Sequence, residues 1–195
     1  MQETYKNNGG AGGAGQALPG WESLTLQLSG TVYDSIVDGP GLRYTIFVQG
    51  CPHACPGCQN PQTHPFTGGT EKSLGEIIKE IGEDPLLSGV TFSGGEPFCQ
   101  AKPLSVLAQQ LKKKGYDLVV YSGYTYERLR DMAQTREEIR TLLDLTDLVV
   151  DGPFIMEQRD MALLYRGSKN QRLIDLAAMR KSGDLTKVLL WKEHA

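Results

Sequence analysis

Residues 43–58 read RYTIFVQGCPHACPGC, and the interpretation of the whole chain starts from this stretch. Its first half is rich in β-branched and aromatic residues, which is typical of a β-strand. Its second half is a CxxxCxxC segment with thiols at Cys51, Cys55 and Cys58. Pro52 and Pro56 remove amide donors, so this segment cannot form a regular helix. We expect a compact loop, directly after a strand, that turns three sulfur atoms inward.

Converging thiolates bind soft metals, either zinc or the iron of an iron–sulfur cluster. A structural zinc site is closed and four-coordinate, and His53 is the nearby candidate for its fourth ligand. A 4Fe–4S cluster held by three cysteines instead leaves one iron open to an outside ligand. The cysteine loop alone leaves both alternatives open.

The composition indicates an ordinary globular protein of 195 residues, 39% hydrophobic and with a formal net charge of −3. This charge gives no reason to expect nucleic-acid binding, and no apolar run reaches the roughly 18 residues of a membrane span. No secretion signal accompanies the four cysteines, so a metal site is favoured over disulfides and a cytoplasmic location is expected. Residues 1–20 are glycine-rich and predict a flexible tail, with one domain over residues 21–195.

Short apolar strands are predicted at 24–28, 43–49, 90–92, 118–121 and 148–150, with weaker ones at 173–174 and 188–190. Helical periodicity lies between them. One helix begins with a capping box at Ser73 and Glu76, one ends at Gly115, and one is predicted to begin with Thr135 to Glu138. This alternation predicts right-handed βαβ units and a parallel sheet. An α+β fold around a zinc knuckle fits the alternation less well.

An unusual loop follows each of the four main strands. These loops are the cysteine loop, Ser93-Gly94-Gly95-Glu96-Pro97, Ser122-Gly123-Tyr124 and Asp151-Gly152-Pro153. Loops at the carboxyl ends of parallel strands share one face, so we expect the four to form one pocket. Gly94 and Gly95 would let the backbone approach a ligand closely, and Glu96 offers a carboxylate to an ammonium group. An amino acid moiety could bind both this loop and an open iron.

At this point the chain resembles the radical S-adenosylmethionine (radical SAM) superfamily, through CxxxCxxC after one strand and Gly-Gly-Glu-Pro after the next. Over residues 30–175 it further resembles the activating proteins of anaerobic (class III) ribonucleoside-triphosphate reductase. Beside the cysteine loop, the blocks that carry this resemblance are Val37–Arg43, Tyr121–Tyr124, Val150–Phe154 and Arg166–Gln171.

The resemblance implies a fold, an activity and a set of site residues. The fold is α/β, a partial, open parallel β/α barrel, since a full eight-stranded barrel takes about 250 residues. Cys51, Cys55 and Cys58 would hold one 4Fe–4S cluster, and the amino and carboxylate groups of S-adenosylmethionine would chelate the fourth iron. Gly94, Gly95 and Glu96 would support the amino group, and Gly57, Cys58 and Gln59 the adenosine end. Ser122 and Asp151 match positions that face the ribose or methionine.

The implied reaction is carried by the cofactors, so no side chain is expected to be catalytic. A reduced cluster cleaves S-adenosylmethionine into methionine and a 5′-deoxyadenosyl radical, which removes hydrogen from a glycine of the partner reductase. The resemblance implies an electron donor of the flavodoxin or ferredoxin type. The alternatives are an activator of another glycyl-radical enzyme, of the formate-lyase type, and a zinc-stabilised interaction module.

Three residues and one segment need a separate interpretation. Gly57 stands where many radical SAM enzymes have an aromatic residue before the last cysteine. Cys99 is predicted to be a small packing residue. Asp151 could cap the following segment, and residues 166–171 could be a solvated polar turn.

Overall fold

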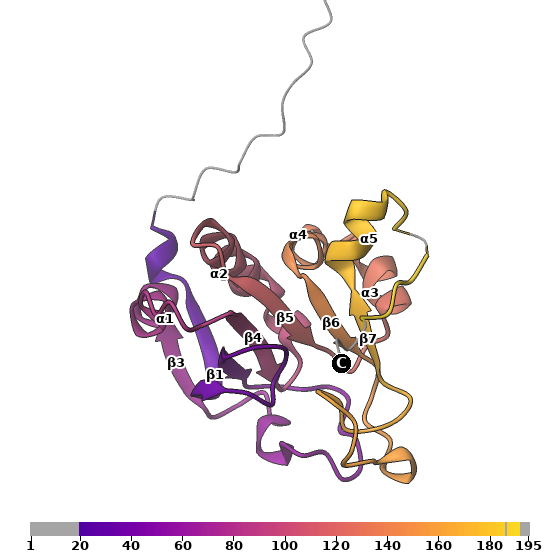
Figure 1. The fold of residues 1–195 in the computed structure, drawn as a ribbon. Helices are drawn as coiled ribbons and strands as arrows, with labels where there is room; N and C mark the ends of the chain where they lie inside the picture. The colour runs from indigo at the N-terminus through magenta and orange to yellow at the C-terminus, as the bar shows by residue number, and fades with distance from the viewer. Residues whose placement is uncertain (1–19, 186, 192–195) are drawn as a thin grey trace, which may run out of the picture.

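The computed structural model describes residues 20–185 and 187–191, which are organised around one seven-stranded sheet (Figure 1). The strand order across the sheet is β3-β1-β2-β4-β5-β6-β7. The strands are β1 Thr25–Ser35, β2 Arg43–Val48, β3 Thr70–Ser73, β4 Gly89–Gly94, β5 Asp117–Tyr121, β6 Leu148–Asp151 and β7 Arg172–Asp175. The tail predicted for residues 1–20 lies, apart from Gly20, outside the described residues.

The four central strands β2, β4, β5 and β6 pair in parallel, which confirms the prediction of a parallel sheet. Both edges are antiparallel, which the sequence analysis did not anticipate: β1 pairs with β2 and β3, and β7 pairs with β6. The connection from β1 to β2 is too short for a crossover, because parallel neighbours need a connection of about a dozen residues or more. The strand predicted at 188–190 is only a bridge between Leu190 and Ile174. The fold is therefore mixed α/β with a parallel centre; closure toward a partial barrel stays a prediction.

Five α-helices connect or follow the strands within the described residues. They are α1 Leu74–Ile81, α2 Ala101–Lys113, α3 Tyr126–Ala133, α4 Glu137–Leu145 and α5 Leu176–Ser182. Short 3₁₀ helices lie at Trp21–Ser23, Pro61–Thr63, Pro97–Gln100 and Met156–Gln158. None of the helices in the described ranges is long and apolar enough to cross a bilayer.

One of the two predicted helix caps is present in the structure. The amide of Glu76 donates to Ser73 Oγ at 3.2 Å and the amide of Ser73 donates to Glu76 Oε2 at 2.9 Å, which is the capping box expected for α1. The cap predicted from Thr135 is wrong. Its hydroxyl bonds back to the carbonyl of Met132 at the end of α3, and α4 begins after Arg136 without a side-chain cap. The connection between α3 and α4 is short, and it places the Thr135 hydroxyl near the end of α3 instead of at the start of α4. The sequence pattern does not show how short this connection is.

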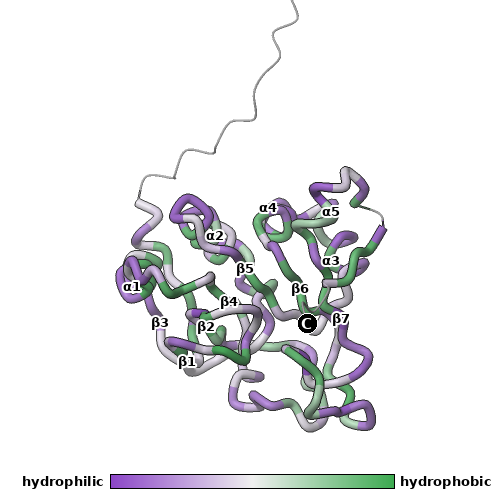
Figure 2. Tube along the Cα trace, viewed as in Figure 1, coloured by the Kyte–Doolittle hydropathy of each residue, from purple (hydrophilic) through white to green (hydrophobic). Residues whose placement is uncertain are grey.

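The two faces of the parallel strands have different roles. Alternate apolar residues, such as Ile46, Phe92 and Val120, pack into one core cluster with the inner faces of the helices. Figure 1 shows the helices grouped along the sheet and the two long loops, 49–69 and 152–171, side by side below it. Figure 2 shows the same hydrophobic strands in green. The residues between, including Thr91, Ser93 and Tyr121, face the opposite side, which is more polar.

Arg43 at the start of β2 is fully buried and organises this opposite face. Its Nε donates to Thr91 Oγ1 at 2.6 Å, Nη1 to the carbonyl of Pro40 at 2.8 Å, and Nη2 to the carbonyl of Val90 at 2.9 Å. Nη2 also lies 2.6 Å from a carboxylate oxygen of Asp117. The guanidinium therefore holds the turn at residues 37–41 against β4 and the amino-terminal end of β5.

Replacing Arg43 by Met should destabilise the fold by about 3 kcal/mol, because buried carbonyls lose charge-assisted hydrogen bonds. Urea unfolding followed by circular dichroism measures this loss. The matched control is Arg136→Met, which removes a partly exposed ion pair with Glu138 and should change stability little. An equal loss in both variants would contradict the organising role of Arg43.

Candidate functional site

The cysteine loop leaves β2 at Val48 and is closed by backbone hydrogen bonds. The amide of Cys51 donates to the carbonyl of His64 at 3.0 Å, and the amide of Cys58 donates to the carbonyl of Cys55 at 3.1 Å. The prolines in the sequence prevent a helix here, and the loop turns back on itself as predicted. Cys51, Cys55 and Cys58 are half-buried and form no disulfide.

The three thiols line one cavity of about 560 Å³. The amide of Asn60 donates to Cys58 Sγ at 3.4 Å, a contact that favours a metal-bound thiolate. Burial raises the pKa of the Cys51 thiol. Among the described residues, no three His, Cys, Asp or Glu side chains converge as they would around a single metal ion. A cluster has a different requirement, because each cysteine binds a separate iron and the thiols surround a volume. Three half-buried thiols that line one cavity, with a backbone amide directed at one sulfur, provide the donor chemistry that a cluster requires.

The Gly-Gly-Glu loop contacts the cysteine loop through backbone atoms. The amide of Gly95 donates to the carbonyl of Val48, and the amide of Glu96 to the carbonyl of Gly50, both at 2.8 Å. A Cβ atom on Gly95 would lie 2.3 Å from the Gly50 carbonyl oxygen, so no other residue fits there. Gly94 and Gly95 also line the cavity. Gly95 is thus needed for a close approach to the cysteine loop, and Gly94 for a close approach to the backbone of Phe47 and Val48 in β2.

Glu96 is completely buried and its carboxylate is saturated. Oε1 accepts from the amide of Phe98 at 3.1 Å, and Oε2 from the amide of Gly123 at 2.9 Å. The hydroxyl of Ser122 donates to both oxygens at 3.0 and 3.1 Å, and Nε2 of His53 lies 2.8 Å from Oε2. These partners use about all four acceptor positions of a carboxylate. The side chain lies behind the cavity wall and is not among the groups that line the cavity.

His53 joins the cysteine loop to this carboxylate. Its ring also packs edge-on against Tyr124, with ring centroids 4.4 Å apart. A Cβ atom on Gly123 would lie 2.3 Å from the ring carbon Cδ2, so the glycine makes room for the imidazole. The sequence analysis selected Ser122-Gly123-Tyr124 but did not anticipate that these residues hold His53. Their position directly after a strand was the only available signal.

Of the two residues expected to face the ribose or methionine, Ser122 lines the cavity and Asp151 does not. Ser122 is buried and lines the cavity. Asp151 is buried on the other side, where it accepts from the amide of Tyr126 at 2.7 Å and from Arg172 Nε at 3.0 Å. The Asp151 and Glu127 carboxylates raise the pKa of Arg172. The predicted cap of the segment after Asp151 is therefore not what its side chain forms: it binds the first amide of α3, which precedes it in the chain, and it does not line the cavity.

Only some of the residues expected near adenosine line the cavity. Cys58 and Gln59 line the cavity, whereas Gly57 does not. Cys99 is exposed, so the prediction that it is a small packing residue is wrong. Its place at the end of the 3₁₀ helix Pro97–Gln100, which the sequence did not show, exposes it.

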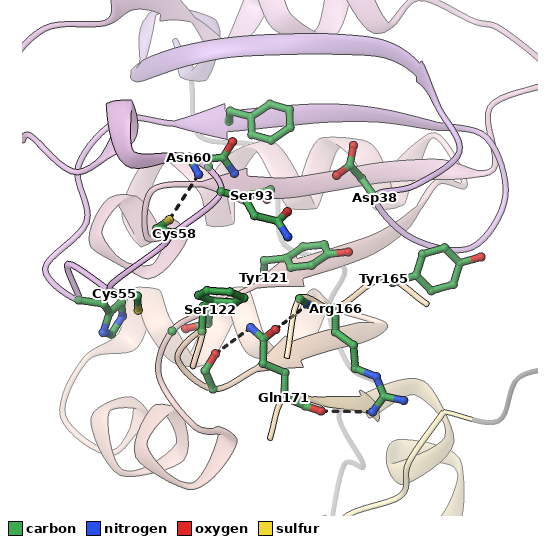
Figure 3. A pocket seen from close by; sticks show the side chains of 18 of the residues that line it. Asp38, Cys55, Cys58, Asn60, Ser93, Tyr121, Ser122, Tyr165, Arg166 and Gln171 are labelled. Carbon is green, nitrogen blue, oxygen red and sulfur yellow. Dashed lines mark hydrogen bonds between the residues drawn. The ribbon is translucent and has the colours of Figure 1, made fainter. Parts of the chain in front are cut away.

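The far end of the cavity holds residues to which the sequence analysis gave no cofactor role. Figure 3 shows Cys55 and Cys58 at one end, Asp38, Tyr165 and Arg166 at the other, and Ser93 and Ser122 between them. Tyr121 and Phe154 add aromatic rings to the lining. Arg166 donates from Nη1 to the carbonyl of Gln171 at 3.2 Å, and its buried Nε has no hydrogen-bond partner among the described residues.

The chain is similar in sequence to known proteins. The family described as "4Fe-4S single cluster domain" matches residues 37–174. The anaerobic ribonucleoside-triphosphate reductase-activating protein of Salmonella typhimurium is 36% identical over 144 residues, covering 70% of this chain and 90% of that protein. The Vibrio cholerae protein of the same name is 38% identical over 144 residues, covering 70% of this chain and 89% of that protein.

A more distant similarity extends to a second kind of activase. The pyruvate formate-lyase-activating enzyme of Clostridium pasteurianum is 33% identical over 123 residues, covering 60% of this chain but only 51% of that enzyme. Identity and coverage are both higher for the first group. The chain therefore belongs to the family of anaerobic ribonucleoside-triphosphate reductase-activating proteins.

Proposed function

We propose that this protein is a radical SAM activase that generates the glycyl radical of anaerobic ribonucleoside-triphosphate reductase. The observation that carries this proposal is the single cavity that three unpaired thiols share with Gly94, Gly95 and Ser122. When bound, a reduced 4Fe–4S cluster would supply the electron that cleaves S-adenosylmethionine to methionine and a 5′-deoxyadenosyl radical, which takes hydrogen from the partner's glycine. The protein residues bind, orient and shield these groups.

The thiols of Cys51, Cys55 and Cys58 would hold three irons of the cluster. The Asn60 amide, already directed at Cys58 Sγ, would stabilise the negative charge on that ligand. One iron would then have no cysteine ligand, and the Gly-Gly-Glu loop, held to Gly50 by the amide of Glu96, would be available to support its outside ligand. The amino acid part of S-adenosylmethionine has the ammonium and carboxylate groups to bind there.

The cavity suits the rest of this ligand. Its volume of about 560 Å³ lies within the roughly 300–1,000 Å³ that is usual for cofactor sites. Gly94, Gly95 and Ser122 would contact the methionine part, and Cys58 and Gln59, with the neighbouring Gly57, the adenosine part. Glu96 supports the amino group through the loop whose shape it determines. Asp151 belongs to this set only indirectly, through the start of α3 that it caps.

The partners and the location follow from the family. We propose the anaerobic ribonucleoside-triphosphate reductase as the macromolecular substrate and a flavodoxin- or ferredoxin-type protein as the electron donor. The formal net charge of −3 supports neither nucleic acid nor membrane as a partner. The reaction needs a reduced cluster, which is consistent with the cytoplasm.

The second candidate is an activator of formate-lyase type, which the Clostridium pasteurianum relative favours. The two candidates differ only in the partner. Anaerobic incubation with reductant, S-adenosylmethionine and either purified partner distinguishes them by electron paramagnetic resonance. A glycyl radical that forms only on the formate lyase would overturn our assignment.

Replacing Cys51, Cys55 or Cys58 by Ala should abolish cluster binding, because two thiolates cannot hold the cluster against exchange. After anaerobic reconstitution, iron content and the thiolate-to-iron absorption near ~400 nm should both be lost. Cys99→Ala is the matched control and should keep both, since Cys99 does not line the cavity. A colourless Cys51 variant that still cleaves S-adenosylmethionine would contradict the assignment, as would a wild-type protein with one tightly bound zinc.

Replacing Glu96 by Ala should weaken S-adenosylmethionine binding about tenfold or more while the cluster remains. The change leaves buried donors of Ser122, Gly123 and Phe98 without an acceptor, so the loop beside the open iron shifts. Equilibrium dialysis with the reconstituted protein measures the affinity, and iron content reports the cluster. Glu137→Ala, at an exposed carboxylate, is the control. Unchanged affinity in the Glu96 variant would show that this loop does not bind the cofactor.

A further inference from the structure

A second cavity, separate from the one that the thiols line, lies between α3, α4 and α5. These three helices are grouped at the end of the sheet formed by β6 and β7 (Figure 1). The cavity has a volume of about 330 Å³ and shares no lining residue with the thiol-lined cavity. This volume is within the range usual for small-molecule sites. The proposed reaction makes no use of this second cavity.

Three guanidinium groups line the second cavity, one from each helix, and they belong to Arg130, Arg140 and Arg180. Among the described lining residues one carboxylate, that of Asp144, opposes them, which leaves a surplus of two positive charges. Glu137 pairs with Arg140 and Asp147 with Arg180 from outside the lining, and such partly exposed pairs are weak. A positive cavity is notable in a protein whose formal net charge is −3.

Main-chain contacts hold two of these guanidiniums in place. Arg130 Nη1 donates to the carbonyl of Leu185 at 3.0 Å, and Arg180 Nη2 donates to the carbonyl of Thr146 at 2.8 Å. A guanidinium has several further N–H donors, so each of these contacts leaves donors free. The two side chains are therefore positioned before a ligand arrives, and they retain hydrogen-bonding capacity for one.

The buried part of the lining is apolar and aromatic. Leu143, Leu176 and Tyr126 are 7%, 3% and 5% exposed. The guanidinium carbon of Arg130 lies 5.9 Å from the centroid of the Tyr126 ring. Burial raises the pKa of the Tyr126 phenol, and the positive charges of Arg130 and Arg180 oppose this rise, which places both cations near the phenol. The cavity thus combines an apolar surface with converging cations.

We propose that this cavity binds an organic phosphate of nucleotide size, with its phosphate groups on the three guanidiniums and its apolar part against Tyr126, Leu143 and Leu176. A guanidinium matches phosphate oxygens with two parallel hydrogen bonds, which a carboxylate-poor cavity leaves available. Asp144 is placed to accept from a hydroxyl or amino group of the same ligand. A protein partner would need a far larger surface than this one cavity. The inference goes beyond the proposed function and does not depend on it.

The test is anaerobic isothermal titration calorimetry of the reconstituted full chain with ATP as the probe. S-adenosylmethionine is present in excess, so that the adenosine end of the thiol-lined cavity is occupied. Arg140→Gln and the double variant R130Q/R180Q should each raise Kd about tenfold or more, because charge-assisted hydrogen bonds to phosphate are lost. Arg128→Gln is the matched control and should bind like wild type, since Arg128 is exposed on α3 and does not line the cavity.

Circular dichroism shows whether the double variant is folded, because that variant also loses two contacts to main-chain carbonyls. The side chain of Arg140 pairs only with the exposed Glu137 among the described residues, so Arg140→Gln tests the cavity without this complication.

Two further readouts define the ligand and its place. Tripolyphosphate, which lacks the base and sugar, should bind about tenfold more weakly than ATP because it makes no apolar contact. Hydrogen exchange should show protection by ATP on α3, α4 and α5. Wild-type protein that binds neither probe at millimolar concentration would overturn the inference, as would unchanged Kd in both arginine variants. Protection on the cysteine loop instead of the three helices would also contradict it, because ATP would then occupy the thiol-lined cavity.

Discussion

The buried carboxylate of Glu96 is the interaction on which the site depends. It lies where three loops meet and accepts from Gly123, Ser122 and Phe98, with His53 of the cysteine loop against its second oxygen. A buried charge is costly unless its acceptor positions are filled, so each loop has one low-energy placement relative to the others. Glu96 thus determines how the cysteine loop faces the Gly-Gly-Glu loop without reaching the cavity itself.

A second buried charge has the corresponding role at the other end. Arg43 holds the turn that presents Ile36 and Val37, and its partner Thr91 binds the carbonyl of Asp38. The cavity therefore lies between two polar networks, each centred on one ionic group. One positions the cysteine loop, and the other holds the turn at residues 37–41 beside the same cavity. Apolar packing of the helices on the opposite face supports both.

Much of this organisation could be predicted from the chain. The four parallel strands and the loops that follow them were readable from short apolar runs and glycine-rich turns, and the Ser73–Glu76 cap from its spacing. The antiparallel edges, the bond of Thr135 to Met132 and the exposure of Cys99 were not. Each of these depends on which segments become neighbours, and local periodicity does not contain that information.

For the candidate site too, some features could be predicted from the sequence and others depend on tertiary contacts. The sequence by itself determined the residue types: three cysteines in a loop that cannot be a helix, two glycines, and a carboxylate after a strand. Only the tertiary structure decided that Glu96 binds neighbouring loops, that Asp151 caps α3 beside Arg172, and that Gly123 accommodates the ring of His53. The physical reason is that a residue's chemistry is local, whereas the acceptors, donors and space around it come from residues distant in sequence. Burial then decides which of its possible partners it meets.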